Sequence, residues 1–198
     1  MLEFYYAPQS RAGVIHWILE ELEVDYLPRL VDIRAEGGAP ESYRAIHPHK
    51  KVPAIVHDGA IIIERPAISI YLGDRFPKPE LTVPVSDPRR GPYLSWMVYL
   101  GTVFDPALCA GIKGWSYASN ETGFGHFKDV MAYISGTLST QRYVLGERLT
   151  LVDLELATSL NWALHATQLV PDEPYLRDYI ARVQDRPSFE RAIGRRAT

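Results

Sequence analysis

The residues that could do chemistry gather around a proline that begins a predicted strand. Pro53 stands at the first position of a β-branched, apolar run, where its missing N–H costs no hydrogen bond of a sheet. The backbone N–H and C=O of Val52, directly before it, have no following helix to pair with. These two groups can hydrogen-bond the backbone of an extended peptide. The sequence therefore predicts a peptide-binding edge at Val52.

Charged residues follow where a predicted strand gives way to a helix. Glu64 and Arg65 close the strand, and Pro66 is the residue type favoured at the first position of a helix. The positive end of the helix dipole suits anions, whereas Arg65 itself is opposed by that dipole and is a poor N-cap. Arg65 therefore needs a compensating anion, either a ligand carboxylate or an acidic neighbour. A solvated side chain is the third interpretation.

Two short strands and a tight turn must position these residues. The runs 52–56 and 60–63 are apolar and rich in β-branched residues, and the Asp58-Gly59 pair between them is a strong hairpin signal. We expect two buried strands, followed by a helix that carries Ala67. The alternative is a buried hairpin and helix without a ligand.

The beginning of the chain repeats the pattern of a strand before a helix. Residues 2–6 are expected to form a strand, and apolar side chains recur at helical spacing from Val14 to Leu22. Ser10 precedes this helix, where its hydroxyl is a natural N-cap among free N–H groups. A strand at 24–32 completes a βαβ unit, which requires a crossover and a parallel pair.

Length and composition limit the class of protein. With 198 residues, of which 46% are hydrophobic, the chain can form one domain or two small ones. Its formal net charge of −3 with scattered Lys and Arg gives no basic patch, so we expect no nucleic-acid or membrane partner. No basic signal region is visible and no apolar run approaches membrane-span length, so we expect a cytoplasmic protein. The single cysteine, Cys109, cannot form an internal disulfide, and no metal-ligand cluster is expected.

The second half of the chain differs from the first, because a proline-dense stretch separates a β-rich part from an all-helical part. The sequence predicts an α/β N-terminal domain at 1–77, a proline-rich linker at 78–92 and an all-α C-terminal domain at 93–198. Helices are expected at 93–100, 127–138, 150–166 and 175–184. The clearest helix start is Thr150, three residues before Asp153, which is the spacing of a capping box.

The motif Lys51-Val52-Pro53-Ala54-Ile55, with Glu64 eleven residues after Pro53, resembles the glutathione transferase family. Gly146 before the Thr150 capping pattern is similar to a buried capping box of the same family. The resemblance implies a thioredoxin-like, glutathione-binding N-terminal domain, an all-α C-terminal domain and glutathione as co-substrate. In the family this proline is cis, and the residue before it pairs with the cysteinyl part of glutathione. A Glu-Ser pair there holds the γ-glutamyl end, and here Arg65 replaces the serine.

The resemblance also implies roles for three further side chains. Such enzymes keep the glutathione thiol as a thiolate, although an ordinary cysteine thiol has a pKa of about 8.5. Ser10 resembles the catalytic serine of theta-like members and is our first choice to hydrogen-bond the sulfur, with N-capping alone as the alternative. Tyr6 lies where tyrosine-type members carry their donor and is our second choice, with a buried structural phenol as the alternative. Lys51 is expected to bind the glycyl carboxylate or to be a solvated charge.

These residues together predict a transferase that conjugates the thiolate of glutathione to a small apolar electrophile held between two domains. The resemblance further implies a homodimer with a role in detoxification. A non-catalytic binding protein that keeps the fold is the alternative that Arg65 favours. A glutathione-dependent isomerase, peroxidase or ether-cleaving enzyme on the same site is a third hypothesis.

Overall fold

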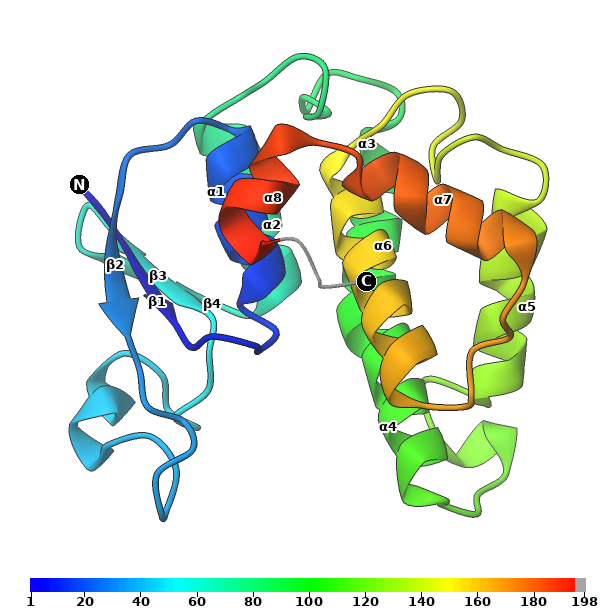
Figure 1. Cartoon of the computed structure of the whole chain (residues 1–198), viewed down its shortest axis with the longest axis horizontal. Coiled ribbons are helices and arrows are strands. Elements are labelled where there is room, and N and C mark those ends of the chain that lie inside the picture. Colours follow the sequence, from blue (N-terminus) through cyan, green and yellow to red (C-terminus); the bar gives the residue numbers. More distant parts are fainter. Residues whose placement is uncertain (195–198) are drawn as a thin grey trace. The chain divides into compact units, whose positions relative to one another are not determined.

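The computed structural model describes residues 1–194 and divides the chain into two compact units (Figure 1). The first unit contains residues 1–76 and the described residues from 186 onward, and the second contains residues 77–185. The first unit is formed by β1 (Leu2–Tyr6), α1 (Gly13–Glu21), β2 (Tyr26–Leu30), the 3-10 helix η1 (Glu41–Ala45), β3 (Ala54–His57), β4 (Ala60–Ile63), α2 (Arg65–Arg75) and α8 (Pro187–Ile193).

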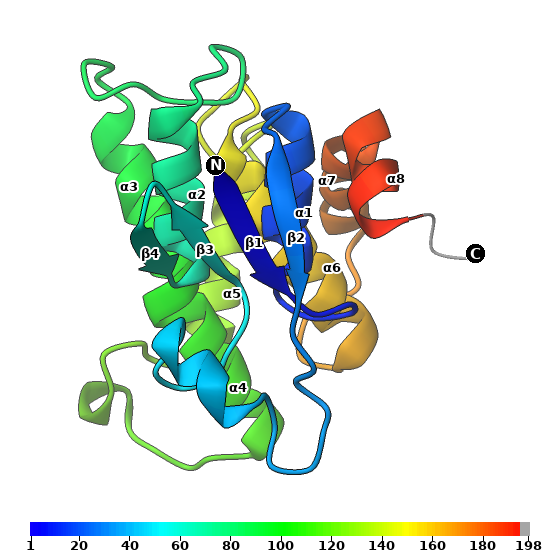
Figure 2. The ribbon, with the colours of Figure 1, turned by 90° about the vertical axis from the view of Figure 1, so that its left-hand side faces the viewer.

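The first unit has one four-stranded sheet in the order β2-β1-β3-β4, which Figure 2 shows with β2 and β4 at its edges. β1 and β2 are parallel, as a βαβ crossover requires, and β3 is antiparallel to both of its neighbours, β1 and β4. The succession βαβ, short helix, ββα confirms the thioredoxin-like topology expected from the sequence.

The prediction of two buried strands is correct for β3 and wrong for β4. Ala54 and Ile55 of β3 are fully buried, whereas Ala60 is exposed and Ile61 has 48% of its surface exposed. The hairpin between the strands forms as expected, with positive φ angles at Asp58 (50°) and Gly59 (83°). β4 is exposed because it is an edge strand, and apolar composition alone does not reveal an edge.

The helix α8 packs against α1 of the first unit, although the sequence placed everything after residue 92 in the helical domain (Figure 1). The indole N–H of Trp17 donates to the Ser188 hydroxyl at 3.0 Å, and the Trp17 and Phe189 rings meet edge to face with centroids 4.8 Å apart. The buried Glu21 carboxylate binds the Arg186 guanidinium. Trp17 and Glu21 of α1 thus bind side chains of α8 and of Arg186, the residue directly before it.

The second unit is helical in the part of the chain that the structure describes. Its elements are α3 (Arg90–Tyr99), the π-helical turn η2 (Leu100–Phe104), α4 (Asp105–Lys113), the 3-10 helix η3 (Ser119–Glu121), α5 (Phe127–Leu138), α6 (Leu151–Ala166) and α7 (Pro174–Gln184). The proline-dense segment before α3 is attached to this unit, because Leu81 and Val83 are buried and the Leu81 carbonyl accepts the Leu151 N–H at 3.1 Å.

The helices α3 and α4 are continuous through η2, which the sequence did not predict beyond residue 100. Pro106 lacks the N–H that a regular helix would use, and the wider π turn lies directly before it. Among the described residues, the resulting span Arg90–Lys113 is long and apolar enough to cross a membrane by length and composition alone. The core helix of a globular protein meets the same criterion, so this span does not overturn the expectation drawn from the sequence.

The predicted capping box at the start of α6 is confirmed. The Thr150 N–H donates to Oδ2 of Asp153 at 2.8 Å. The other carboxylate oxygen, Oδ1, accepts the Val144 N–H at 2.8 Å and the Tyr179 hydroxyl at 3.0 Å. Burial raises the pKa of Asp153 to about 6, although these donors oppose the shift. Asp153 therefore joins the start of α6 to α7 and to the loop at Val144.

Candidate glutathione site

The strand register brings three segments of the first unit to one end of the sheet. Tyr5 pairs with Ala54, and Ala54 pairs with Ile63. The chain therefore leaves β1, enters β3 and leaves β4 at the same end, the lower end in Figure 2. The register places the Ser10 loop, the Val52-Pro53 bond and the start of α2 around this end.

The Val52-Pro53 peptide bond is cis, as the resemblance implied. Neither the N–H nor the C=O of Val52 makes a hydrogen bond within the described part of the chain. The Val52 side chain is half-buried and packs with Val31, Ala39 and Tyr43. A fixed side chain beside a backbone donor and acceptor that are both open is the geometry that pairs with an extended peptide.

The loop before Val52 is held by Tyr43 of η1. The Tyr43 carbonyl accepts the N–H groups of Ile46 and His47, both at 2.9 Å, and the Tyr43 hydroxyl donates to the Lys51 carbonyl at 3.0 Å. Burial raises the pKa of Tyr43 to about 12, so the hydroxyl stays a donor throughout the neutral range. The Lys51 side chain is exposed and can reach an anion beside this loop.

Glu64 and Arg65 occupy the junction of β4 and α2 with opposite exposure. Glu64 is exposed and has a φ of 67°, a left-handed conformation that is strained for a residue with a side chain. Arg65 is the first residue of α2 and only 6% of its surface is exposed. The interpretation of Arg65 as a solvated side chain is therefore wrong, and a ligand or an acidic neighbour remains as the compensating anion.

The Ser10 hydroxyl caps a turn before α1 rather than the helix itself. It accepts the Ala12 N–H at 3.2 Å and donates to the Ala7 carbonyl at 2.7 Å, whereas α1 starts at Gly13 with Ala12 at its N-cap. The expected N-cap is thus displaced by two residues. A thiolate near Ser10 would compete with the Ala7 carbonyl for the hydroxyl proton.

Tyr6 ends β1 at the same end of the sheet, but its ring belongs to an aromatic cluster. It stacks on Phe4 with centroids 5.4 Å apart and lies 6.2 Å from the His16 ring of α1. Tyr5, one residue earlier and on the opposite face, lies 5.8 Å from Tyr43. This packing favours the structural interpretation of Tyr6 over its role as thiol donor.

Two residues at this end of the sheet gave no clear signal in the sequence. Arg34 donates to the carbonyls of Pro8 at 2.9 Å and Gln9 at 3.2 Å, which ties the segment after β2 to the Ser10 loop. His47 is 3% exposed, and its Nδ1 accepts the N–H of His49 at 3.1 Å. Only the His-x-His spacing before Val52 could have indicated this turn.

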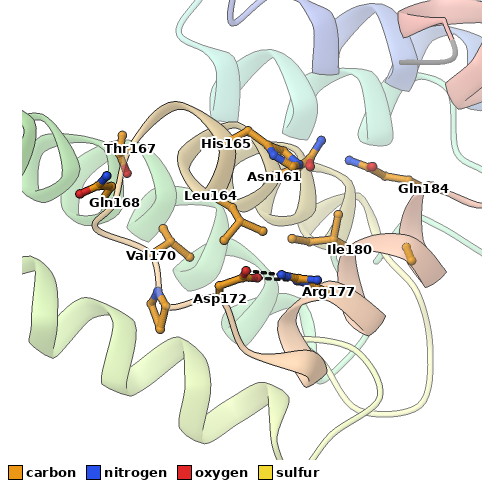
Figure 3. Close-up of a pocket in the computed structure, with 12 residues that line it drawn as sticks. Asn161, Leu164, His165, Thr167, Gln168, Val170, Asp172, Arg177, Ile180 and Gln184 are labelled. Carbon is orange, nitrogen blue, oxygen red and sulfur yellow. Dashed lines mark hydrogen bonds and ion pairs between the residues drawn. The ribbon is translucent and has the colours of Figure 1, made fainter. Parts of the chain in front are cut away.

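A separate pocket of about 860 Å³ lies between α6 and α7 in the second unit (Figure 3). Leu164, Val170 and Ile180 form its apolar part. Asp172 and Arg177 line it as an ion pair, so their charges compensate each other. None of the predicted site residues lies in it. Within the described residues, no group of three or more His, Cys, Asp or Glu side chains could hold a metal ion.

The fold and the site define the class: a thioredoxin-like unit with an open backbone edge at a cis-proline, followed by a helical unit. The family model for the glutathione S-transferase N-terminal domain matches residues 4–80, and the model for the C-terminal domain matches residues 119–187. These matches cover more than half of the chain. The chain belongs to the glutathione S-transferase family, and glutathione is the co-substrate that fits it.

Individual relatives agree with the family. Glutathione S-transferase GstA of Escherichia coli O157:H7 is 25% identical over 197 residues, and the match covers 97% of each chain. The crystal structure of a glutathione transferase from Methylococcus capsulatus superimposes with a TM-score of 0.80 at 25% identity, covering 98% of this chain and 97% of the other. The stringent starvation protein A homolog of Histophilus somni is 26% identical over 180 residues, covering 89% of this chain and 82% of that protein.

Proposed function

We propose that this protein is a glutathione transferase that conjugates glutathione to small apolar electrophiles. The observation that carries the proposal is the open N–H and C=O of Val52 beside the cis-proline. This backbone edge suits the cysteinyl residue of a bound tripeptide. It also lies at the end of the sheet where the Ser10 loop and the start of α2 are found.

The side chains around this edge fit the ends of the tripeptide. The glycyl carboxylate would bind the exposed ammonium of Lys51, and the γ-glutamyl ammonium would face the exposed carboxylate of Glu64. The γ-glutamyl carboxylate would lie at the start of α2, where the helix dipole and the Arg65 guanidinium both favour an anion. A guanidinium group can donate two hydrogen bonds to one carboxylate, whereas a serine hydroxyl can donate only one.

The chemical step is attack by the thiolate sulfur on an electrophilic carbon. The thiol first gives its proton to solvent, and the new C–S bond then forms as the leaving group departs with its electron pair. The Ser10 hydroxyl turns from the Ala7 carbonyl to the sulfur and stabilises the thiolate. One pKa unit is about 1.4 kcal/mol, so this contribution is modest and placement of the two reactants supplies the rest.

The assembly and location follow the same proposal. A homodimer, the commonest closed assembly of soluble proteins, and a cytoplasmic detoxifying role are expected. Light scattering at micromolar concentration should give twice the mass of the 22.4 kDa chain. A monomer under these conditions would remove the dimer from the proposal.

Two measurements test the function. Because a ligand that binds only the native state must stabilise it, glutathione at a hundred times its dissociation constant should add about 2.7 kcal/mol and raise the melting temperature. The protein should then form a thioether from glutathione and an aryl halide such as chlorodinitrobenzene. Absence of both stabilisation and product would reject the proposal. Product analysis would separate conjugation from isomerase, peroxidase or ether-cleaving activity.

A non-catalytic glutathione-fold protein is the second candidate, and one observation favours it. The Ser10 hydroxyl proton is already engaged by the Ala7 carbonyl at 2.7 Å, and the tyrosine that could replace it, Tyr6, is packed among aromatic rings. The chain is also similar to a stringent starvation protein A homolog, a relative whose name does not describe a transferase. Tight glutathione binding without turnover of any electrophile would support this candidate.

A further inference from the structure

The loop that precedes Val52 contains a turn that is closed by a hydrogen bond to the His47 ring. Nδ1 of His47 accepts the His49 N–H at 3.1 Å, and the His47 carbonyl accepts the Lys50 N–H at 2.9 Å. Lys50 has a φ of 54°, which lets the chain reverse towards Val52. With 3% of its surface exposed, the imidazole is an internal part of the turn rather than a surface group.

This hydrogen bond defines the protonation state of the ring. A nitrogen that accepts an N–H carries no proton, so His47 is neutral and its proton is on Nε2. Protonation at Nδ1 would set two donors against each other, and the bond to His49 would be lost. The turn therefore forms with neutral His47 and opens when the ring gains a second proton.

The turn is coupled to Val52 through Tyr43. The carbonyl of Tyr43 holds the beginning of the loop at His47, and its hydroxyl holds the end at Lys51. Tyr43 therefore holds both ends of the segment from His47 to Lys51. If the turn inside this short segment opens, Lys51 and the adjoining Val52 must shift. A change at His47 is thus transmitted to the backbone groups of Val52.

We propose that neutral His47 is a positioning residue that holds the backbone of Val52 in place for glutathione, and that protonation of His47 releases it. This inference rests on the proposed glutathione site. His47 acts through Val52 and touches no reacting atom.

The charges around the His47 ring determine the pH at which protonation releases the loop. Burial lowers the pKa of His47 from its ordinary value of 6.5, and the positive charges of His49 and Lys51 lower it further. Glu64, at the junction of β4 and α2, opposes them. The Lys50 ammonium is paired with Glu41 at 3.5 Å, and Arg44 binds the Pro48 carbonyl. The loop is therefore closed at neutral pH, and it opens only on acidification below the range in which an ordinary histidine gains its proton.

Three variants of the full chain test this role. His47→Asn keeps a side-chain acceptor for the turn but cannot be protonated in this range. His47→Leu fills the space without an acceptor. His49→Asn is the matched control, because it removes an exposed histidine two residues away and keeps the backbone N–H. The ligand is S-methylglutathione, which has no thiol and so no thiol titration.

Calorimetry between pH 5 and 8 should give a distinct profile for each protein. We expect the wild type and His49→Asn to lose about tenfold in affinity on acidification. His47→Asn should bind within about threefold of the wild type at pH 7.5 and show no such loss, whereas His47→Leu should bind about tenfold more weakly at every pH. The His49 amide resonance of the free wild type should titrate together with the His47 ring.

Each contrary result overturns the inference. A wild-type pH profile in His47→Asn, or wild-type affinity in His47→Leu, would show that His47 does not position Val52. Unfolding of His47→Leu is detected by circular dichroism and leaves the His47→Asn comparison decisive. If the wild type fails to bind at pH 7.5, the proposed function itself has failed and the role of His47 falls with it.

Discussion

The hydroxyl of Tyr43 donates a hydrogen bond to the carbonyl of Lys51 at 3.0 Å, so a residue of η1 fixes the backbone one residue before the peptide-binding edge. This bond is independent of any ligand. It explains how Val52 can keep its own N–H and C=O open and still be held in a defined position.

Tyr43→Phe should remove this anchor and leave the ring packing intact. We expect the free energy of unfolding to fall by about 1 kcal/mol, the usual worth of one hydrogen bond, and the affinity for S-methylglutathione to fall severalfold. Urea unfolding and calorimetry measure the two effects. Tyr5→Phe is the matched control, because its hydroxyl binds Glu3 instead. Equal affinity losses in both variants would contradict the role given to Tyr43.

Ser10→Ala should slow conjugation at pH 7 by about ten- to a hundredfold, since a hydrogen bond to a charged sulfur is worth about 1.5–3 kcal/mol. Tyr6→Phe should slow it less, because the Tyr6 ring is packed on Phe4. Ultraviolet titration of the bound thiol provides the direct readout. A thiol pKa that is unchanged in Ser10→Ala but raised in Tyr6→Phe would reverse this order.

Arg65→Ser should weaken glutathione binding by about 1.5–3 kcal/mol if the guanidinium holds the γ-glutamyl carboxylate. Arg65→Lys keeps the positive charge but loses the bidentate hydrogen bonding, so we expect an affinity between those of the wild type and Arg65→Ser. Because Arg65 is buried, unfolding curves of both variants must accompany the calorimetry. Equal or tighter binding by Arg65→Ser would show that the arginine obstructs the site, and would favour the non-catalytic candidate.

Asp153→Asn should reduce the free energy of unfolding by about 1–3 kcal/mol, because an amide can accept at only one of the two carboxylate positions. The folded pKa of Asp153, about 6, lies above its ordinary value of 3.8, so folding favours the protonated form. Its contribution is complete below about pH 4 and declines as the pH rises to about 6. The variant should lack this decline.

Denaturant unfolding of the wild type and of Asp153→Asn between pH 3.5 and 7 isolates this effect. Asp178→Asn, an exposed carboxyl on α7, is the matched control and should follow the wild type. Parallel pH profiles for the wild type and Asp153→Asn would show that Asp153 keeps an ordinary pKa.

Local chemistry made much of the first unit predictable. The Asp58-Gly59 pair fixes a hairpin and Pro53 marks the start of β3, because each motif determines a backbone geometry within a few residues. In the second unit, Thr150 with Asp153 marks the start of α6 for the same reason. The resemblance on Lys51-Val52-Pro53 correctly indicated the cis bond.

Features that depend on distant contacts were not predictable. The exposure of β4 depends on its place in the strand order, and the direction of the Tyr6 ring depends on the face to which β1 is turned. The burial of Arg65 opposes the tendency of arginine to stay exposed. The turn at His47 uses a side-chain acceptor that sequence patterns rarely assign to histidine.

The return of α8 to the first unit also affects how the protein is made. Because a ribosome releases the chain from its N-terminus, α1 emerges long before α8, and the whole second unit is synthesised between them. Until α8 has been synthesised, Trp17 and Glu21 of α1 lack the contacts that α8 and Arg186 provide. The first unit can therefore complete its packing only after the whole second unit has been made and α8 has left the ribosome.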